Sequence, residues 1–200
     1  QYLKSTKGVD AEDAVLARYR DDLTKERNGR PVDSAGPLDF GVRLLTTAGF
    51  SAWETITYEK GTWVLRMLRQ RLGDDGFHKL QLAMLSQYAA KPISDEDFRH
   101  LASEFVPAGQ GDRSLTDFFD AWVYGTGIPT LRLRGAGRNA SLDMSGVDDE
   151  FTDDIPLACR SRQGRSETRW VLASSGDNPL NLPRGESCSL PSPSAFLYSR

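Results

Sequence analysis

The chain has 200 residues, a formal net charge of −3 at pH 7 and a sequence pI near 5.5. Hydrophobic residues make up 38% and charged residues 26%, which is ordinary for a globular protein with a sizeable core. The acidic balance disfavours general nucleic-acid binding, which usually needs a basic field. No apolar run in the sequence approaches the roughly 18 residues of a membrane helix, and the first four residues lack the basic-then-apolar order of a signal peptide.

The first 125 residues are predicted to be mostly helical. Residues 1–7 have the pattern of the end of a helix that stops at Gly8, and Asp10 is expected to cap a second helix. The apolar stripe of this second helix consists of Val15, Leu16, Tyr19 and Leu23.

The clearest helical pattern covers residues 57–72 and ends at Gly73, where a glycine in the left-handed region is expected. The residues expected to face the core are Leu65, Leu68 and Leu72, and those expected to lie mostly away from it are Arg66, Arg69, Gln70 and Arg71. Further helices are predicted at residues 77–88, after a Ser94–Asp97 capping pair, and at residues 114–122.

Beyond Pro129 the pattern changes to a period of two, which indicates strands. Strands are predicted at residues 131–134, around residue 142, and at residues 155–159, 170–173 and 196–198, separated by turn signals. The sequence therefore predicts an α+β protein with a helical part at residues 1–130. A small β-rich domain, an antiparallel sandwich, is expected at residues 131–200.

The sequence offers few metal ligands. Zinc catalysis needs three ligands, often two of them from H-E-x-x-H on a helix, whereas His78 and His100 each stand alone. Both histidines are predicted to be solvated. The acidic run at residues 148–150, with Asp153 and Asp154, lacks the spacing of a calcium loop and is likewise predicted to be a solvated face.

The two cysteines, Cys159 and Cys188, both lie in the C-terminal part. The sequence leaves open whether they are bridged or are two free thiols. A bridge would contribute about 3 to 4 kcal/mol in the chain-entropy model and would favour an oxidising location, secreted or periplasmic.

Tyr58 opens the clearest helix, and spacing alone predicts a packed ring with a hydrogen-bonded hydroxyl. However, the tetrapeptide Tyr58-Glu59-Lys60-Gly61 and its surroundings resemble the region after the zinc site in gluzincin aminopeptidases, the membrane alanyl aminopeptidase family. The similar segments are residues 36–38, 43–44, 56–69, 72–77 and 118–131.

The resemblance implies that the chain is the helical second half of a thermolysin-like catalytic domain followed by a β-sandwich. It also implies that Tyr58 stabilises the oxyanion in a full-length parent, a zinc metallopeptidase that removes N-terminal residues from peptides. Glu59 and Lys60 are expected to make helix-surface or interdomain contacts, and Gly61 to allow close helix packing.

The family's zinc ligands are absent from the chain, and in the family pattern they precede Gln1. We therefore expect no metal and no peptidase activity in this chain alone, and one zinc ion in the parent. The implied partners are the missing N-terminal half of the catalytic domain and a peptide substrate.

Two alternatives remain open. The first is a non-catalytic helical module that binds partner proteins through an exposed apolar face. The second is a member of the same family whose parent has lost the zinc ligands.

Overall fold

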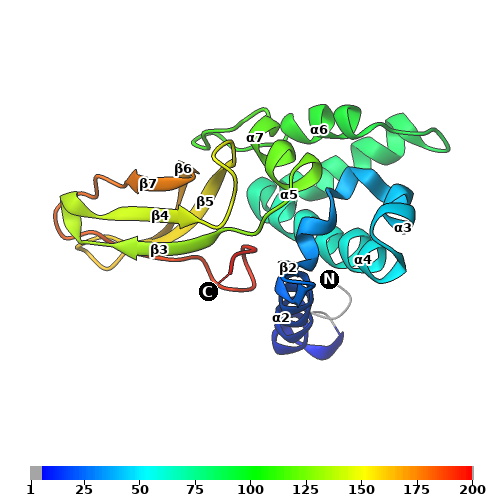
Figure 1. The fold of residues 1–200 in the computed structure, drawn as a ribbon. Helices are drawn as coiled ribbons and strands as arrows, with labels where there is room; N and C mark the ends of the chain where they lie inside the picture. The colour runs from blue at the N-terminus through cyan, green and yellow to red at the C-terminus, as the bar shows by residue number, and fades with distance from the viewer. Residues whose placement is uncertain (1–5, 200) are drawn as a thin grey trace.

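The structure is a computed structural model, and it describes residues 6–199. Helical elements follow one another as far as Tyr124, interrupted by one short hairpin, and the longer strands begin at Thr130. The helices gather on one side of the molecule and the strands extend from them on the other (Figure 1). This arrangement confirms the predicted α+β class.

The helical part contains the long helix α5, the helices α2 and α6, and several shorter helical turns (Figure 1). The elements in chain order are α2 (Val9–Thr24), β1 (Glu26–Arg27), β2 (Arg30–Pro31), η1 (Val32–Ala35), η2 (Leu38–Arg43), α3 (Leu44–Thr47), α4 (Phe50–Glu54), η3 (Thr55–Lys60), α5 (Gly61–Tyr88), α6 (Asp95–Ser103), α7 (Thr116–Phe119) and η4 (Asp120–Tyr124). No helix in the described part of the chain combines the length and the apolar character needed to cross a membrane.

The beginning of α2 differs from the prediction. Gly8 occupies the N-cap position without a side-chain hydrogen bond. Asp10 lies inside the first turn, where its negative charge interacts favourably with the positive end of the helix dipole. Leu16 and Leu23 of the predicted stripe are buried. The helix end predicted at residues 1–7 lies largely outside the described residues.

The break predicted at Gly73 is confirmed within α5. Its φ of 72° and ψ of 166° are non-helical, so the helix is kinked there rather than continuous. The predicted capping pair before α6 is also confirmed, because the Asp97 backbone N–H donates to the Ser94 hydroxyl oxygen at 3.1 Å. These two signals are local in sequence and local in structure.

The strands form two three-stranded antiparallel sheets. One sheet consists of β3 (Thr130–Arg134), β4 (Ser141–Ser145) and β7 (Gly176–Pro179), and η5 (Gly137–Asn139) joins its first two strands. The other has the order β6-β5-β8, from β5 (Thr152–Arg160), β6 (Ser166–Ser174) and β8 (Ser187–Ser189).

The strand predicted at residues 196–198 is absent. This segment packs on the helices instead: the Leu197 N–H approaches the Met67 sulfur at 3.4 Å, and the ring of Phe196 lies edge-on to Trp122 at 5.7 Å. Only Ser199 bridges to β3, through Thr130. An apolar run can therefore be buried without joining a sheet.

One apolar cluster joins the helices to the strands. It includes Trp63 of α5, Trp122 of η4, and Ile155 and Leu157 of β5, all essentially inaccessible to solvent. Because the core continues across the junction, burial does not mark a boundary at residue 130, and the predicted domain division stays a prediction.

Arg71 is buried at this junction, contrary to the prediction that it lies away from the core. Its guanidinium donates to Asp153 at 2.7 Å and to Asp154 at 2.6 Å, both at the start of β5. It also donates to the side chain of Gln110 at 3.0 Å and to the Asp112 carbonyl at 3.1 Å. The predicted solvated face therefore fails at Asp153 and Asp154, since both are buried with Arg71 as their counter-charge.

Candidate functional site

Tyr58 lies in η3, a π-helical turn between α4 and α5. Its side chain is 59% exposed, and its ring lies edge-on to Trp53 with centroids 5.7 Å apart. Among the described residues, no side chain or carbonyl makes a hydrogen bond with its hydroxyl. The prediction from spacing alone, a packed tyrosine with a hydrogen-bonded hydroxyl, is therefore wrong. The phenol is accessible to a molecule in solvent.

A pocket of about 380 Å³ opens beside the phenol. Its walls are mostly apolar and come from η2, α5, α6, α7 and η4: Leu38, Leu65, Leu68, Phe98, Phe118 and Val123. The carboxylates of Asp39 and Asp95 also line it. Tyr58 is thus a hydrogen-bond donor at the edge of an apolar hollow, next to two acidic side chains.

Lys60 is the last residue of the same turn and its side chain is fully buried, so the helix-surface position expected for it is wrong. Its Nζ forms an ion pair with Asp33 Oδ1 at 2.8 Å and donates to the Gly125 carbonyl at 3.2 Å. Asp33 is equally buried, and its other oxygen accepts the Gly127 N–H at 2.6 Å. The turn that carries Tyr58 is therefore connected to η1 and to the chain that leads into β3.

Glu59 occupies a third environment, half-buried near α2. Burial raises the pKa of the Glu59 carboxyl, the charge of Asp22 raises it further, and Arg18 opposes both. These neighbours make Glu59 part of the contact between η3 and α2 rather than of the pocket.

Gly61 does not show the close packing that was expected of it. A Cβ added at this position would meet only Leu38, at 3.9 Å, which is ordinary contact. Its φ of −56° is also helical. Neither space nor backbone conformation requires a glycine here.

Both histidines are exposed, as predicted, and His100 lies 3.0 Å from Glu96 on the same helix. Within residues 6–199, one set of three potential metal ligands lies close together: Cys159, Cys188 and Glu186. The two sulfurs are bonded to each other, so they are not available as thiolate ligands. The described residues therefore do not fit a catalytic zinc site.

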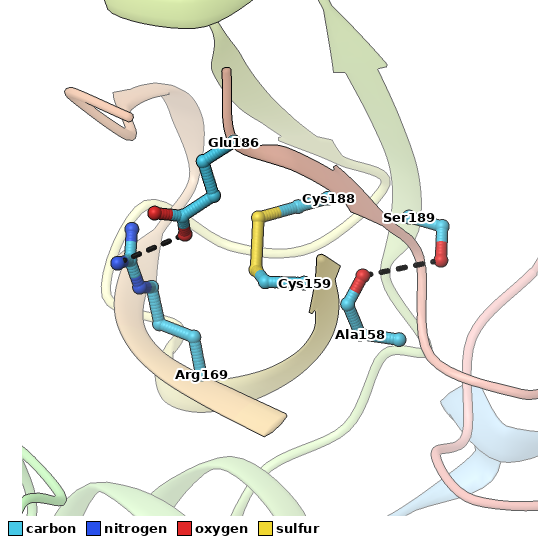
Figure 2. Close-up of a disulfide and its surroundings, with 6 residues drawn as sticks. All are labelled: Ala158, Cys159, Arg169, Glu186, Cys188 and Ser189. Atoms are coloured by element: carbon cyan, nitrogen blue, oxygen red, sulfur yellow. Dashed lines mark hydrogen bonds and ion pairs between the residues drawn. A yellow bond between two sulfur atoms is a disulfide. The ribbon is translucent and has the colours of Figure 1, made fainter. Parts of the chain in front are cut away.

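The disulfide joins β5 to β8, where Cys159 and Cys188 are direct partners in the antiparallel register (Figure 2). Glu186 points instead toward Arg169 of β6, at 2.9 Å, and the Ser189 hydroxyl donates to the Ala158 carbonyl at 3.3 Å. The disulfide and the Ser189 hydrogen bond tie the short edge strand β8 to the central strand β5, and the Glu186–Arg169 ion pair joins the residue before β8 to β6.

The buried cations were missed because each was considered singly. Arg71 follows Val64, Met67 and Leu68 at intervals of seven, four and three residues, which places it on their apolar face. Lys60 precedes Trp63 and Val64 at the matching intervals. The partners of Arg71 lie 39 to 83 residues away, so only the folded chain brings them together.

Residues 36–122 match the peptidase family M1 domain. The resemblance to M1 aminopeptidases is therefore confirmed over this segment, which is less than half of the chain. The matched segment contains Tyr58, Lys60 and all of the named pocket walls except Val123. It ends at Trp122, just before the chain turns into β3.

Two rice proteins (Oryza sativa subsp. japonica) are similar over a wider stretch. Aminopeptidase M1-D is 24% identical over 127 residues, and Aminopeptidase M1-C is 22% identical over 131 residues. The matches cover 61% and 63% of this chain but only 14% of each relative. These similarities relate the matched segment to metallopeptidases. The chain spans only a small part of the length of these relatives.

Proposed function

We propose that this chain is part of a zinc-dependent M1 aminopeptidase that removes N-terminal residues from peptides, and that Tyr58 stabilises the oxyanion of that reaction. The observation that carries the proposal is the exposed Tyr58 phenol at the edge of an apolar pocket, inside the segment that matches the M1 domain. The zinc ion would be held by residues outside this chain, because the described residues do not supply a ligand set.

The chemistry required of Tyr58 is simple. Attack of water on a peptide carbonyl places negative charge on the carbonyl oxygen, and a neutral phenol can donate a hydrogen bond to that charge. A donor that is already in place stabilises the transition state more than the ground state. The π-helical turn suits this role, since such turns are frequent at functional sites.

The proposed partners are a peptide and the other half of the catalytic domain. Several large apolar side chains in η2, α4 and α5 are exposed: Val42 at 72%, Phe50 at 63% and Leu65 at 48%. Contact with a further part of the enzyme would remove these side chains from water. By itself, the chain is expected to bind no catalytic zinc and to cleave no peptide.

The test is Tyr58→Phe in the full-length protein that contains this chain. This change keeps the ring and its contact with Trp53 but removes the donor. We expect turnover of an N-terminally free peptide to fall about 100-fold or more, with metal content unchanged.

The matched control is Tyr88→Phe, which removes a phenol at the far end of α5. It should leave turnover at the wild-type level. Wild-type turnover in Tyr58→Phe would exclude the role proposed for this residue.

The same exposed apolar residues favour a second function, a non-catalytic module that binds a partner protein through this face. The two functions differ in the sequence ahead of Gln1. An H-E-x-x-H motif followed by a glutamate supports the peptidase, and its absence supports either the binding module or a family member without zinc.

A further inference from the structure

A buried ion pair lies directly beneath the turn that carries Tyr58. The side chains of Lys60 and Asp33 are 0% and 2% exposed, and their charged atoms are 2.8 Å apart. A buried charge without a partner is strongly destabilising, so each side chain restricts where the other can lie. The Lys60 side chain is therefore held in one place.

The opposite side of the pair is fixed by a loop of unusual shape. Asp33 accepts the Gly127 N–H, and Lys60 donates to the Gly125 carbonyl. Gly127 has a φ of +108°, and a Cβ on Gly125 would lie 2.6 Å from the Asp120 carbonyl oxygen. Only glycine adopts these positions without strain, so the loop presents its two backbone groups in one arrangement.

Tyr58 and Lys60 lie two residues apart in the same six-residue turn, one side chain pointing out and the other in. We propose that the Lys60–Asp33 ion pair is a positioning device that sets the direction of the Tyr58 phenol. This inference rests on the proposed function. It assigns no contact with the substrate to Lys60 or Asp33.

The expected effect follows from geometry. A misplacement of about 1 Å in a reacting group can cost about 100-fold in rate. If the pair aims the phenol, loosening the pair should lower kcat and leave KM unchanged. The loss should also vanish when the phenol has no hydroxyl to aim.

The test uses Lys60→Met combined with Asp33→Asn in the full-length protein. Both charges disappear together, so neither remains buried alone, and the new amide oxygen still accepts the Gly127 N–H. The control is Arg134→Met combined with Asp143→Asn, an exposed pair of 3.0 Å on the first sheet. Circular dichroism checks that both variants fold. If the first does not, Lys60→Arg alone, which keeps the buried charge paired but changes the length and shape of the side chain, gives the same comparison at a smaller expected loss.

We expect kcat to fall about 10- to 100-fold in the buried-pair variant and to stay unchanged in the control. In a Tyr58→Phe background the same pair of changes should cause no further loss. Amide hydrogen exchange at residues 55–61 should accelerate in the buried-pair variant only.

Two results would overturn the inference. One is a folded variant with the kcat and exchange rates of the control. The other is an equal loss of kcat with and without the Tyr58 hydroxyl, which would indicate a general structural role. If Tyr58→Phe alone has wild-type turnover, the proposed function fails instead, and the exchange rates at residues 55–61 decide whether the pair fixes the turn.

Discussion

The carboxylate of Asp153 is fully buried, and both of its oxygens accept hydrogen bonds. The Arg71 guanidinium donates to one oxygen, and the Trp122 indole N–H donates to the other at 2.7 Å. The neighbouring carboxylates of Asp154 and Asp112 share the same guanidinium. Burial raises the pKa of Asp153 to about 6, and this effect exceeds the opposing effects of Arg71 and Trp122.

This pKa predicts an unusual dependence of stability on pH. Between about pH 4 and pH 6 the folded protein holds the Asp153 proton more tightly than the unfolded chain does. Stability from this group therefore decreases as pH rises through that range, by about 2 to 3 kcal/mol. Urea unfolding of the wild type and of Asp153→Asn at several pH values measures it, and the difference between the two curves isolates this residue. A difference that does not change with pH would contradict the prediction.

At the residue scale, the sequence predicted side chains whose environment is set by near neighbours. The exposed histidines are examples. It did not predict Arg71, Lys60, Asp153 or Asp154, since the burial of a charge depends on a counter-charge far away in the chain. The sequence pattern also did not predict the exposure of Tyr58, because an aromatic side chain in an amphipathic helix is usually packed.

At the scale of elements, two of the three glycines in α5 have different backbone conformations. Gly73 has a φ of +72° with ψ of 166°, a combination that is essentially restricted to glycine, whereas Gly61 is helical. No atom lies within 4 Å of a Cβ added at Gly73, so the cost of a side chain there comes from the backbone alone.

We therefore expect opposite effects from the same substitution in one helix. Gly73→Ala should destabilise the protein by about 1 to 3 kcal/mol. Gly61→Ala should stabilise it by up to about 1 kcal/mol, since alanine favours a helix and only Leu38 lies near. Thermal unfolding of the two variants measures the contrast, and equal shifts would contradict it.

Elements were predictable where a local signal marks them. The Gly73 kink, the Ser94 cap and the alternation in β3 are such signals. The segment at residues 196–198 was not predictable in this way. Its apolar residues are compatible with a strand, and the available surface on α5 and η4 decided their position.

For the whole molecule, the disulfide is the covalent link between chain segments that are 29 residues apart. The loop that it closes contains β6 and the chain leading to β8. In the chain-entropy model, a disulfide acts mainly by restricting the conformations of the unfolded chain. Cys159→Ser combined with Cys188→Ser should therefore lower the free energy of unfolding by about 3 to 4 kcal/mol. Urea titration checks this, with added reductant as the control: it should weaken the wild type and leave the variant unchanged.

The shared core also limits how the protein can be divided. If the chain were cut after residue 130, Arg71 would keep only Gln110 and Asp112 of its buried partners, and the Trp122 indole would lose its acceptor. A positive charge and an aromatic surface would then face water where β5 had been. The smallest piece suitable for expression and purification therefore includes both the helices and the two sheets.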